Sequence, residues 1–173
     1  LNASPNDLKK ELQAQIDLAK SIGIKPTHID SHEGALFFDQ SIFKTYLDIG
    51  EENQLPVFVP KEVAVHFDKS FPKPENVVIV ENMYMALPNL EFKDWSDYYV
   101  NVIENLKPGL NEIIVHLGYD DKEMQQITIE HPNYGSKWRN LDMDVVSSES
   151  FKQAIEKNNI KLVTWREIQK VIY

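Results

Sequence analysis

The chain has 173 residues, of which 42% are hydrophobic, enough for one ordinary domain with a buried core, and this composition excludes disorder over most of the chain. Its 18 basic and 27 acidic residues give a net charge of −9, so nucleic acid and anionic membranes are poor candidate partners. The absence of cysteine excludes disulfides and thiolate metal sites, which leaves His, Asp and Glu as metal ligands. No apolar run is long enough to cross a bilayer or to form a secretory signal, and we expect a cytoplasmic protein without membrane contact.

Helices are predicted at both ends of the chain and between them. The first begins with Ser4 as N-cap and Pro5 in the first turn, and apolar residues then recur at helical spacing up to Gly23. Further helices are predicted at residues 39–52, from Asp94 or Ser96 to about residue 107, at 148–159 and at 165–172.

Strands are predicted between these helices, at residues 24–29, 56–59, 63–67, 76–83, 110–118 and 160–164. The run at 110–118 is almost continuously apolar, which is typical of a strand buried on both faces. Residues 119–146 show no clear period, and a loop of this length in a compact domain is usually functional.

Alternating helices and strands predict an α/β fold with a mainly parallel sheet covered on both faces, in a single domain spanning residues 1–173. The chain holds four or five strands, whereas a closed eight-stranded barrel needs about 250 residues. The sequence therefore predicts either a small open sheet or the later part of a larger barrel.

The most distinctive local pattern is His28, Asp30 and His32. On an extended strand these three side chains point to the same side, so they could present metal- or proton-handling groups to one cavity. Imidazole and carboxylate suit zinc, manganese, iron, cobalt or nickel. The alternative is a polar strand end whose histidines cap neighbouring carbonyl groups.

His116 lies near the end of the later apolar strand. Catalytic groups of parallel α/β folds gather at the carboxyl ends of strands, so His116 and His32 could share one cleft. The alternative for His116 is a buried neutral imidazole paired with a backbone group. We interpret His131 as a turn residue and His66 as structural or exposed.

Other polar residues near His116 allow two interpretations each. Asp120 and Asp121 could orient an imidazole or hold a substrate hydroxyl, or could cap a helix. Arg139 with Trp138 and Asp142 could bind a sugar, although a surface Arg–Asp pair is the commoner arrangement. Glycine-rich phosphate loops and the Gly-x-Ser-x-Gly elbow are absent, which disfavours nucleotide binding and serine hydrolysis.

Three motifs together resemble a known family. They are Pro-Thr-His-Ile-Asp-Ser-His at 26–32, Glu-Ile-Ile-Val-His-Leu-Gly-Tyr-Asp-Asp at 112–121, and Trp-Arg at 138–139 followed by Trp-Arg-Glu at 165–167. Their order and spacing resemble the YdjC-like (ChbG/HpnK-type) carbohydrate deacetylases, relatives of the polysaccharide deacetylases. The resemblance runs from about residue 8 to residue 168.

This resemblance implies a distorted (β/α) barrel, a divalent metal such as Mg²⁺ or Zn²⁺, and hydrolysis of an N-acetyl group on an amino sugar or oligosaccharide. It implies His32 as a metal ligand, His116 as an acid–base residue and Asp30 as the carboxylate that orients an imidazole. We expect four further residues to contact the carbohydrate substrate: His28, Tyr119, Asp120 and Arg139.

The sequence departs from the family pattern in three ways. Glu33 and Gly34 stand where many members have further histidines, and His116-Leu117-Gly118 replaces His-Pro-Gly. The family's upstream Asp-Asp segment and second His motif have no match in these 173 residues. We therefore expect the C-terminal part of a larger deacetylase domain, an incomplete barrel lacking its N-terminal strands.

An incomplete barrel has an exposed sheet edge that invites pairing. We expect a homo-oligomer or a complementing N-terminal fragment to complete it. The alternative function is a non-catalytic carbohydrate-binding or structural remnant, in which Trp138, Tyr134 and Tyr119 supply a sugar-stacking surface.

Overall fold

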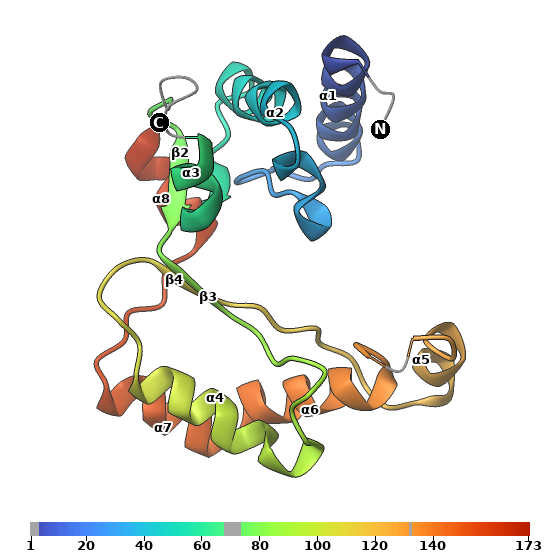
Figure 1. Cartoon of the computed structure of the whole chain (residues 1–173), viewed down its shortest axis with the longest axis vertical. Helices are drawn as coiled ribbons and strands as arrows, with labels where there is room; N and C mark the ends of the chain where they lie inside the picture. Colours follow the sequence, from blue (N-terminus) through green and yellow to red (C-terminus); the bar gives the residue numbers. More distant parts are fainter. Residues whose placement is uncertain (1–3, 68–73, 132) are drawn as a thin grey trace. The chain divides into compact units, whose positions relative to one another are not determined.

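A computed structural model describes residues 4–67, 74–131 and 133–173. The chain forms two compact units, the first made of Leu1–Glu81 and Val163–Tyr173 and the second of Asn82–Leu162. Each unit contains a two-stranded parallel sheet and several helices (Figure 1). The predicted α/β class with parallel strands is therefore confirmed, whereas the barrel, its incompleteness and the single domain stay predictions.

In unit 1 the sheet pairs β1 with β2 in parallel, with Val57 opposite Val77 and Pro60 opposite Val80. The elements of this unit are α1 (Pro5–Ser21), the 3₁₀ helix η1 (His32–Phe37), α2 (Gln40–Glu52), β1 (Val57–Pro60), α3 (Lys61–Phe67), β2 (Val77–Val80) and α8 (Trp165–Ile172).

The helix caps of unit 1 follow the sequence. Ser4 Oγ accepts a hydrogen bond from the backbone N–H of Asp7, which begins α1, and the Asp39 carboxylate accepts from the first turn of α2. Thr164 and Glu167 form a reciprocal capping box at the start of α8. The predictions for these three helices are confirmed.

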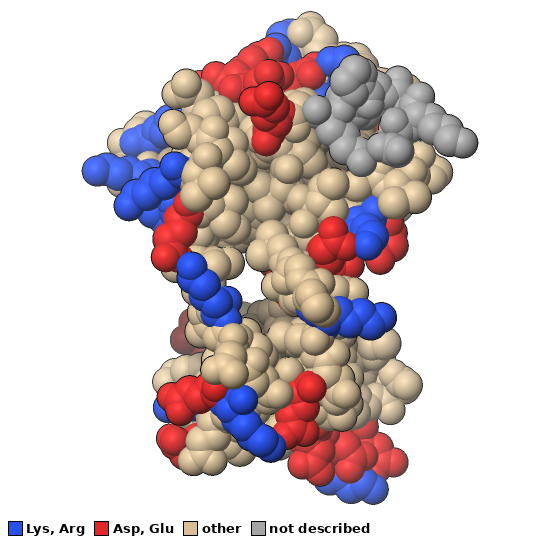
Figure 2. All heavy atoms as spheres, turned by 90° about the vertical axis from the view of Figure 1, so that its left-hand side faces the viewer, with Lys and Arg blue, Asp and Glu red and all other residues tan. Residues whose placement is uncertain are grey.

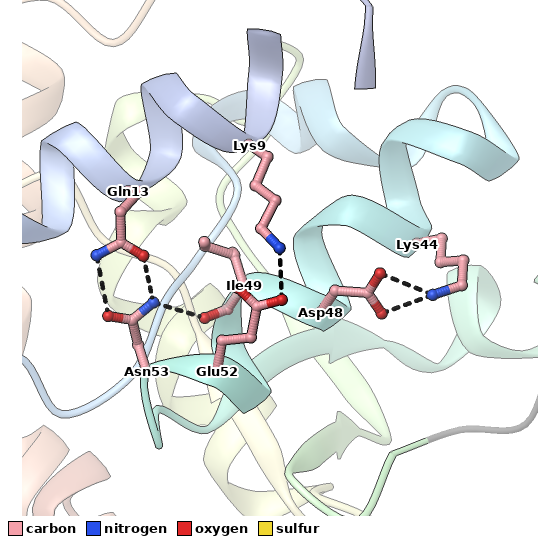
Figure 3. A network of polar contacts seen from close by, with 7 residues as sticks. All are labelled: Lys9, Gln13, Lys44, Asp48, Ile49, Glu52 and Asn53. Atoms are coloured by element: carbon pink, nitrogen blue, oxygen red, sulfur yellow. Dashed lines mark hydrogen bonds and ion pairs between the residues drawn. The ribbon is translucent and has the colours of Figure 1, made fainter. Parts of the chain in front are cut away.

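Helices α1 and α2 lie side by side and are joined by polar side chains (Figure 3). The amides of Gln13 and Asn53 bond reciprocally at 2.8 and 3.2 Å, and Lys9 Nζ lies 2.5 Å from Glu52 Oε1. An exposed ion pair contributes only about 0–1 kcal/mol, and a hydrogen bond about 0.5–1.5 kcal/mol. The apolar contact of Ile16 with its buried neighbours beneath them is therefore the larger stabilising term.

The core of unit 1 lies between α2 and β1. Its fully buried side chains come from both elements, namely Tyr46, Leu47, Ile49, Val57 and Val59. This core fixes β1, the strand beside which the Pro26–His32 motif runs.

In unit 2 the sheet pairs β3 with β4 in parallel, with Tyr84 opposite Ile113. The elements are β3 (Asn82–Tyr84), the 3₁₀ helix η2 (Phe92–Asp94), α4 (Trp95–Glu104), β4 (Asn111–Ile113), α5 (Lys122–Ile127), α6 (Ser136–Ser147) and α7 (Glu149–Lys157). Helix α4 packs against α6 and α7 around a core of buried aromatic side chains that includes Trp95, Tyr99 and Trp138 (Figure 1).

Two predicted strands are helical or nearly absent. Residues 63–67 belong to α3, because Ala64 and Phe67 are the buried pair at helical spacing while Val65 is 66% exposed. The strand predicted at 24–29 is reduced to one bridge from Ile29 to Val57.

The later part of the chain contains more helix than predicted. Only Asn111–Ile113 of the run at 110–118 forms a strand, and its residues are half-buried, so the prediction of a strand buried on both faces is wrong. The predicted loop at 119–146 contains α5 and α6. Residues 160–164 form no strand, and Leu162 is 72% exposed.

The surface carries both signs of charge. Figure 2 shows acidic and basic side chains interspersed over the described residues of one face, without a broad basic patch there. Within the described ranges, no helix has the length and apolar character needed to span a membrane.

Candidate functional site

In unit 1, backbone pairing with β1 positions the Pro26–His32 motif. The Ile29 N–H donates to the carbonyl oxygen of Pro56 at 2.9 Å, and the Phe58 N–H donates to that of Ile29 at 3.1 Å. The buried Tyr46 hydroxyl lies 2.9 Å from the carbonyl oxygens of both Ile29 and Phe58. These contacts fix the residue that directly precedes Asp30.

The chain turns into η1 after Ser31. Asp30 Oδ1 accepts a hydrogen bond from the Ser31 N–H at 2.6 Å, and Ser31 Oγ accepts from the Leu36 N–H at 2.9 Å. Glu33 and Gly34 then have φ angles of 53° and 69°, in the left-handed region that glycine adopts readily. The prediction that His28, Asp30 and His32 alternate along a regular strand is therefore wrong, since pairing ends at Ile29 and His32 begins η1.

Asp30, which precedes this turn, and His32, which begins it, are both exposed. Within residues 4–67, 74–131 and 133–173, no group of three or more His, Asp or Glu side chains is arranged to hold a metal ion. Hydrolytic zinc sites typically use three protein ligands. The described residues therefore do not fit a complete metal site, and His32 as a single ligand stays a prediction.

His28 packs against the C-terminal helix of the same unit. Its ring stacks on Trp165 with the centroids 4.1 Å apart and the planes 4° from parallel, and its Nδ1 lies 3.0 Å from Thr27 Oγ1. Burial lowers the pKa of His28, and the nearby Asp30 charge offsets part of that effect. His28 therefore joins α8 to the motif, and its contact with a substrate stays a prediction.

In unit 2, a buried carboxylate holds the backbone at His116. Asp142 on α6 is 0% exposed, and its Oδ2 accepts a hydrogen bond from the His116 N–H at 2.8 Å. Its Oδ1 accepts from Trp95 Nε1 at 2.8 Å and from the Tyr99 hydroxyl at 2.9 Å. One carboxylate thereby joins α4, α6 and the segment that follows β4.

The His116 imidazole packs against Tyr134, with ring centroids 5.0 Å apart. Its Nδ1 is buried and has no hydrogen-bond partner among the described residues. Burial lowers the pKa of His116, as does the Arg139 charge, while Asp142 raises it. A largely neutral imidazole can accept a proton and pass it on, and because Nδ1 is enclosed by protein, this exchange has to use Nε2.

The other predicted substrate residues differ in exposure. Tyr119 is 66% exposed, and Arg139 is half-buried with its Nε donating to the Tyr134 carbonyl oxygen at 2.8 Å. Asp120 accepts hydrogen bonds from Ser136 and Gln125. Both bonds lower the pKa of Asp120, and the bond from Ser136 has the larger effect. Asp121 caps α5 by accepting from the Met124 N–H, so its predicted capping role is confirmed.

Trp138 and Asp142 do not form a sugar-binding surface. Trp138 is 3% exposed and packs between Trp95 and Tyr134, and Asp142 is fully buried. Both predictions that gave Trp138 a sugar contact are therefore wrong. The sequence offered one signal for the buried role of Asp142, since it lies four residues after Trp138 and three before Val145 on the buried face of α6.

His32 lies in unit 1 and His116 in unit 2. The prediction that they share one cleft stays a prediction.

The family model described as YdjC-like protein matches residues 1–157. The chain belongs to the YdjC-like family. The resemblance inferred from the motifs is thereby confirmed.

Three relatives are each named carbohydrate deacetylase. The protein of Clostridium beijerinckii is 24% identical over 169 residues, covering 96% of this chain and 63% of the relative. That of Thermoanaerobacter pseudethanolicus is 23% identical, with 95% and 61% covered, and that of Brevibacillus brevis is 24% identical, with 97% and 64% covered. The YdjC-like chain thus spans less than two thirds of the length of these relatives.

A solved structure shares the fold. A protein of Enterococcus faecalis V583, described as a cellobiose-phosphate cleavage protein, superposes with a TM-score of 0.70 at 20% identity, covering 96% of this chain and 62% of that one.

Proposed function

We propose that the protein hydrolyses the N-acetyl group of an amino sugar or an oligosaccharide, releasing acetate and a free amine. Membership of the YdjC-like family and three relatives named carbohydrate deacetylase support this reaction class. The structural observation that carries the proposal is His116, a half-buried imidazole whose backbone N–H is held by the buried Asp142 carboxylate.

His116 is the acid–base residue of this proposal. Its lowered pKa leaves the ring largely neutral near pH 7, so it can take the proton that an attacking water loses. When the C–N bond of the tetrahedral intermediate breaks, the imidazolium returns that proton to the departing amine nitrogen. Water is consumed, acetic acid and amine are formed, His116 regains its starting state, and the acid then releases its proton to solvent as acetate.

A divalent cation such as Mg²⁺ or Zn²⁺ is part of the proposal, with His32 as one ligand and Asp30 orienting an imidazole. Such a cation polarises a substrate carbonyl group when bound. Because the described residues do not complete a ligand set, no step is assigned to it.

Four residues are proposed to contact the carbohydrate, namely His28, Tyr119, Asp120 and Arg139. Tyr119 suits this role through its exposed ring, since aromatic faces pack on the apolar face of a sugar. Arg139 suits it because Nε donates to the Tyr134 carbonyl oxygen, and among the described residues the terminal nitrogens remain available as hydrogen-bond donors. We also propose that a second chain, either an identical copy or a complementing N-terminal fragment, supplies the further metal ligands, because the described residues do not complete a ligand set.

The test uses the natural protein that contains this chain and follows acetate release from chitooligosaccharides. General acid–base catalysis contributes about 100- to 10,000-fold, so His116→Ala should lower turnover by at least about 100-fold. His131→Ala is the matched control, because His131 is an exposed histidine of the same unit, and it should keep wild-type turnover. Unchanged turnover in folded His116→Ala would refute the assignment, and glycan binding without acetate release would favour the non-catalytic alternative.

A further inference from the structure

Asp142 is a fully buried carboxylate with three hydrogen-bond donors. The donors are the indole of Trp95, the hydroxyl of Tyr99 and the backbone N–H of His116, at 2.8, 2.9 and 2.8 Å. Burying a carboxylate is costly unless donors replace the lost water. An apolar side chain would fill the same place on α6 without that cost, so packing alone does not account for an acid at this position.

The three donors come from two different parts of unit 2. Trp95 and Tyr99 lie one turn apart on α4, and both bond to the same oxygen, Oδ1. This pair fixes the orientation of the carboxyl group, which leaves Oδ2 directed at the backbone of His116. Because β4 ends at Ile113, this bond holds the chain where strand pairing no longer does.

We infer that Asp142 is a positioning residue, which holds His116 in place from inside unit 2 for proton transfer. This inference rests on the proposed function of His116, and Asp142 itself touches no substrate in it. Trp95 and Tyr99 act indirectly, since they hold the Asp142 carboxylate that in turn holds His116.

The Asp142 carboxylate acts on His116 by its charge as well as by its hydrogen bond, and both effects are part of the inference. Arg139, three residues before Asp142 on α6, disfavours the protonated imidazole, and the Asp142 carboxylate favours it. The Tyr134 ring, a further titratable group, packs on the imidazole. Asp142 therefore raises the pKa of His116, whereas burial and Arg139 lower it. The imidazole can thus still be protonated during turnover.

The test compares Asp142→Asn with Asp144→Asn, its matched control. Asp144 lies on the same helix, is exposed and accepts a hydrogen bond from Asn140. Asparagine has nearly the shape of aspartate, but it is neutral and its NH₂ group cannot accept a hydrogen bond. In Asp142→Asn at least one of the three donors loses its acceptor, whereas Asp144→Asn leaves all three in place.

The primary readout is the NMR titration of the His116 imidazole, assigned among the five histidines by comparison with His116→Ala. We expect its midpoint to move to lower pH in Asp142→Asn and to stay at the wild-type value in Asp144→Asn. An unchanged midpoint in folded Asp142→Asn would overturn the inference. This readout needs no turnover, so it separates failure of the inference from failure of the proposed function.

Two further measurements test the positioning role in turnover and the hydrogen bond itself. In acetate release, Asp142→Asn should lower kcat by at least about tenfold with KM nearly unchanged, because positioning acts on the reaction step. If Asp142→Asn does not fold, the wild-type protein gives the answer through the scalar coupling between the His116 amide nitrogen and the Asp142 side-chain carboxyl carbon. A measurable coupling supports the bond that carries the inference, and its absence contradicts it.

Discussion

Replacing Gly50 with alanine tests how tightly α2 packs on β1. A Cβ at this position would overlap Cγ2 of Val57 and would lie 3.1 Å from the Leu55 carbonyl oxygen and 3.2 Å from Asn76 Nδ2. Carbon atoms in contact are normally about 3.5–4.0 Å apart. Two of these neighbours are a fully buried side chain and a backbone atom, so α2 must move away from the sheet.

Two opposing terms set the size of the effect. Alanine is the better helix former by about 1 kcal/mol, while overpacking a core costs about 1–3 kcal/mol or more. Because the overlap is with a fully buried side chain and a backbone oxygen is also close, we expect the upper part of that range and a net destabilisation of about 2 kcal/mol. For a chain of this size that corresponds to a fall in Tm of roughly 4–8 °C.

The assay is urea denaturation of wild type, Gly50→Ala, Val57→Ala and the double variant. Val57→Ala removes the overlapped methyl group, so the double variant should be more stable than the sum of the single effects predicts. A Gly50→Ala variant stabilised by about 1 kcal/mol, as helix propensity alone requires, would refute the packing argument.

Two further predictions concern the C-terminal helix and the histidines. Thr164→Ala removes the side-chain cap of α8 and should lower the free energy of unfolding by about 1 kcal/mol in urea denaturation, and no loss would contradict the observed capping box. Burial lowers the pKa values of His28 and His116 below the usual 6.5, so the unfolded chain binds more protons. Stability should therefore be greatest above pH 6.5 and fall as the pH drops through 6.5 towards the folded pKa values; equal urea midpoints at about pH 7.5 and about pH 5.5 would contradict this.

The helices with local end signals could be predicted from the sequence. Ser4, Asp39 and Ser148 each cap a helix that begins at the next residue, as their positions before apolar periods indicate. A cap and an apolar face are encoded within about two turns of chain, so they need no knowledge of the rest of the fold.

The strands were harder to predict because a strand needs a partner. Residues 160–164 have the apolar and β-branched side chains of a strand, but no ladder forms there within the described chain. Ile29 pairs only as a single bridge, and although Ser31 is still extended, the chain enters η1 at His32. Residue type alone does not show where pairing stops.

The candidate site was predictable in part. His116 and His32 stood out because imidazole at strand ends is chemically distinctive, and the motifs identified the family correctly. The sequence places Asp142 in a surface pair with Arg139 or at a sugar, since acidic residues are mostly exposed. Its burial follows from the donors Trp95 and Tyr99, which are more than 40 residues away in the sequence.

The most direct test of the account is the stoichiometry of products from an N-acetylated chitooligosaccharide incubated with the natural protein that contains this chain. Hydrolysis of the amide bond predicts one acetate and one new free amine per event, with the glycosidic bonds intact, and near-complete loss of both products in His116→Ala. Cleavage of the sugar chain without acetate, or equal acetate release by wild type and folded His116→Ala, would contradict it.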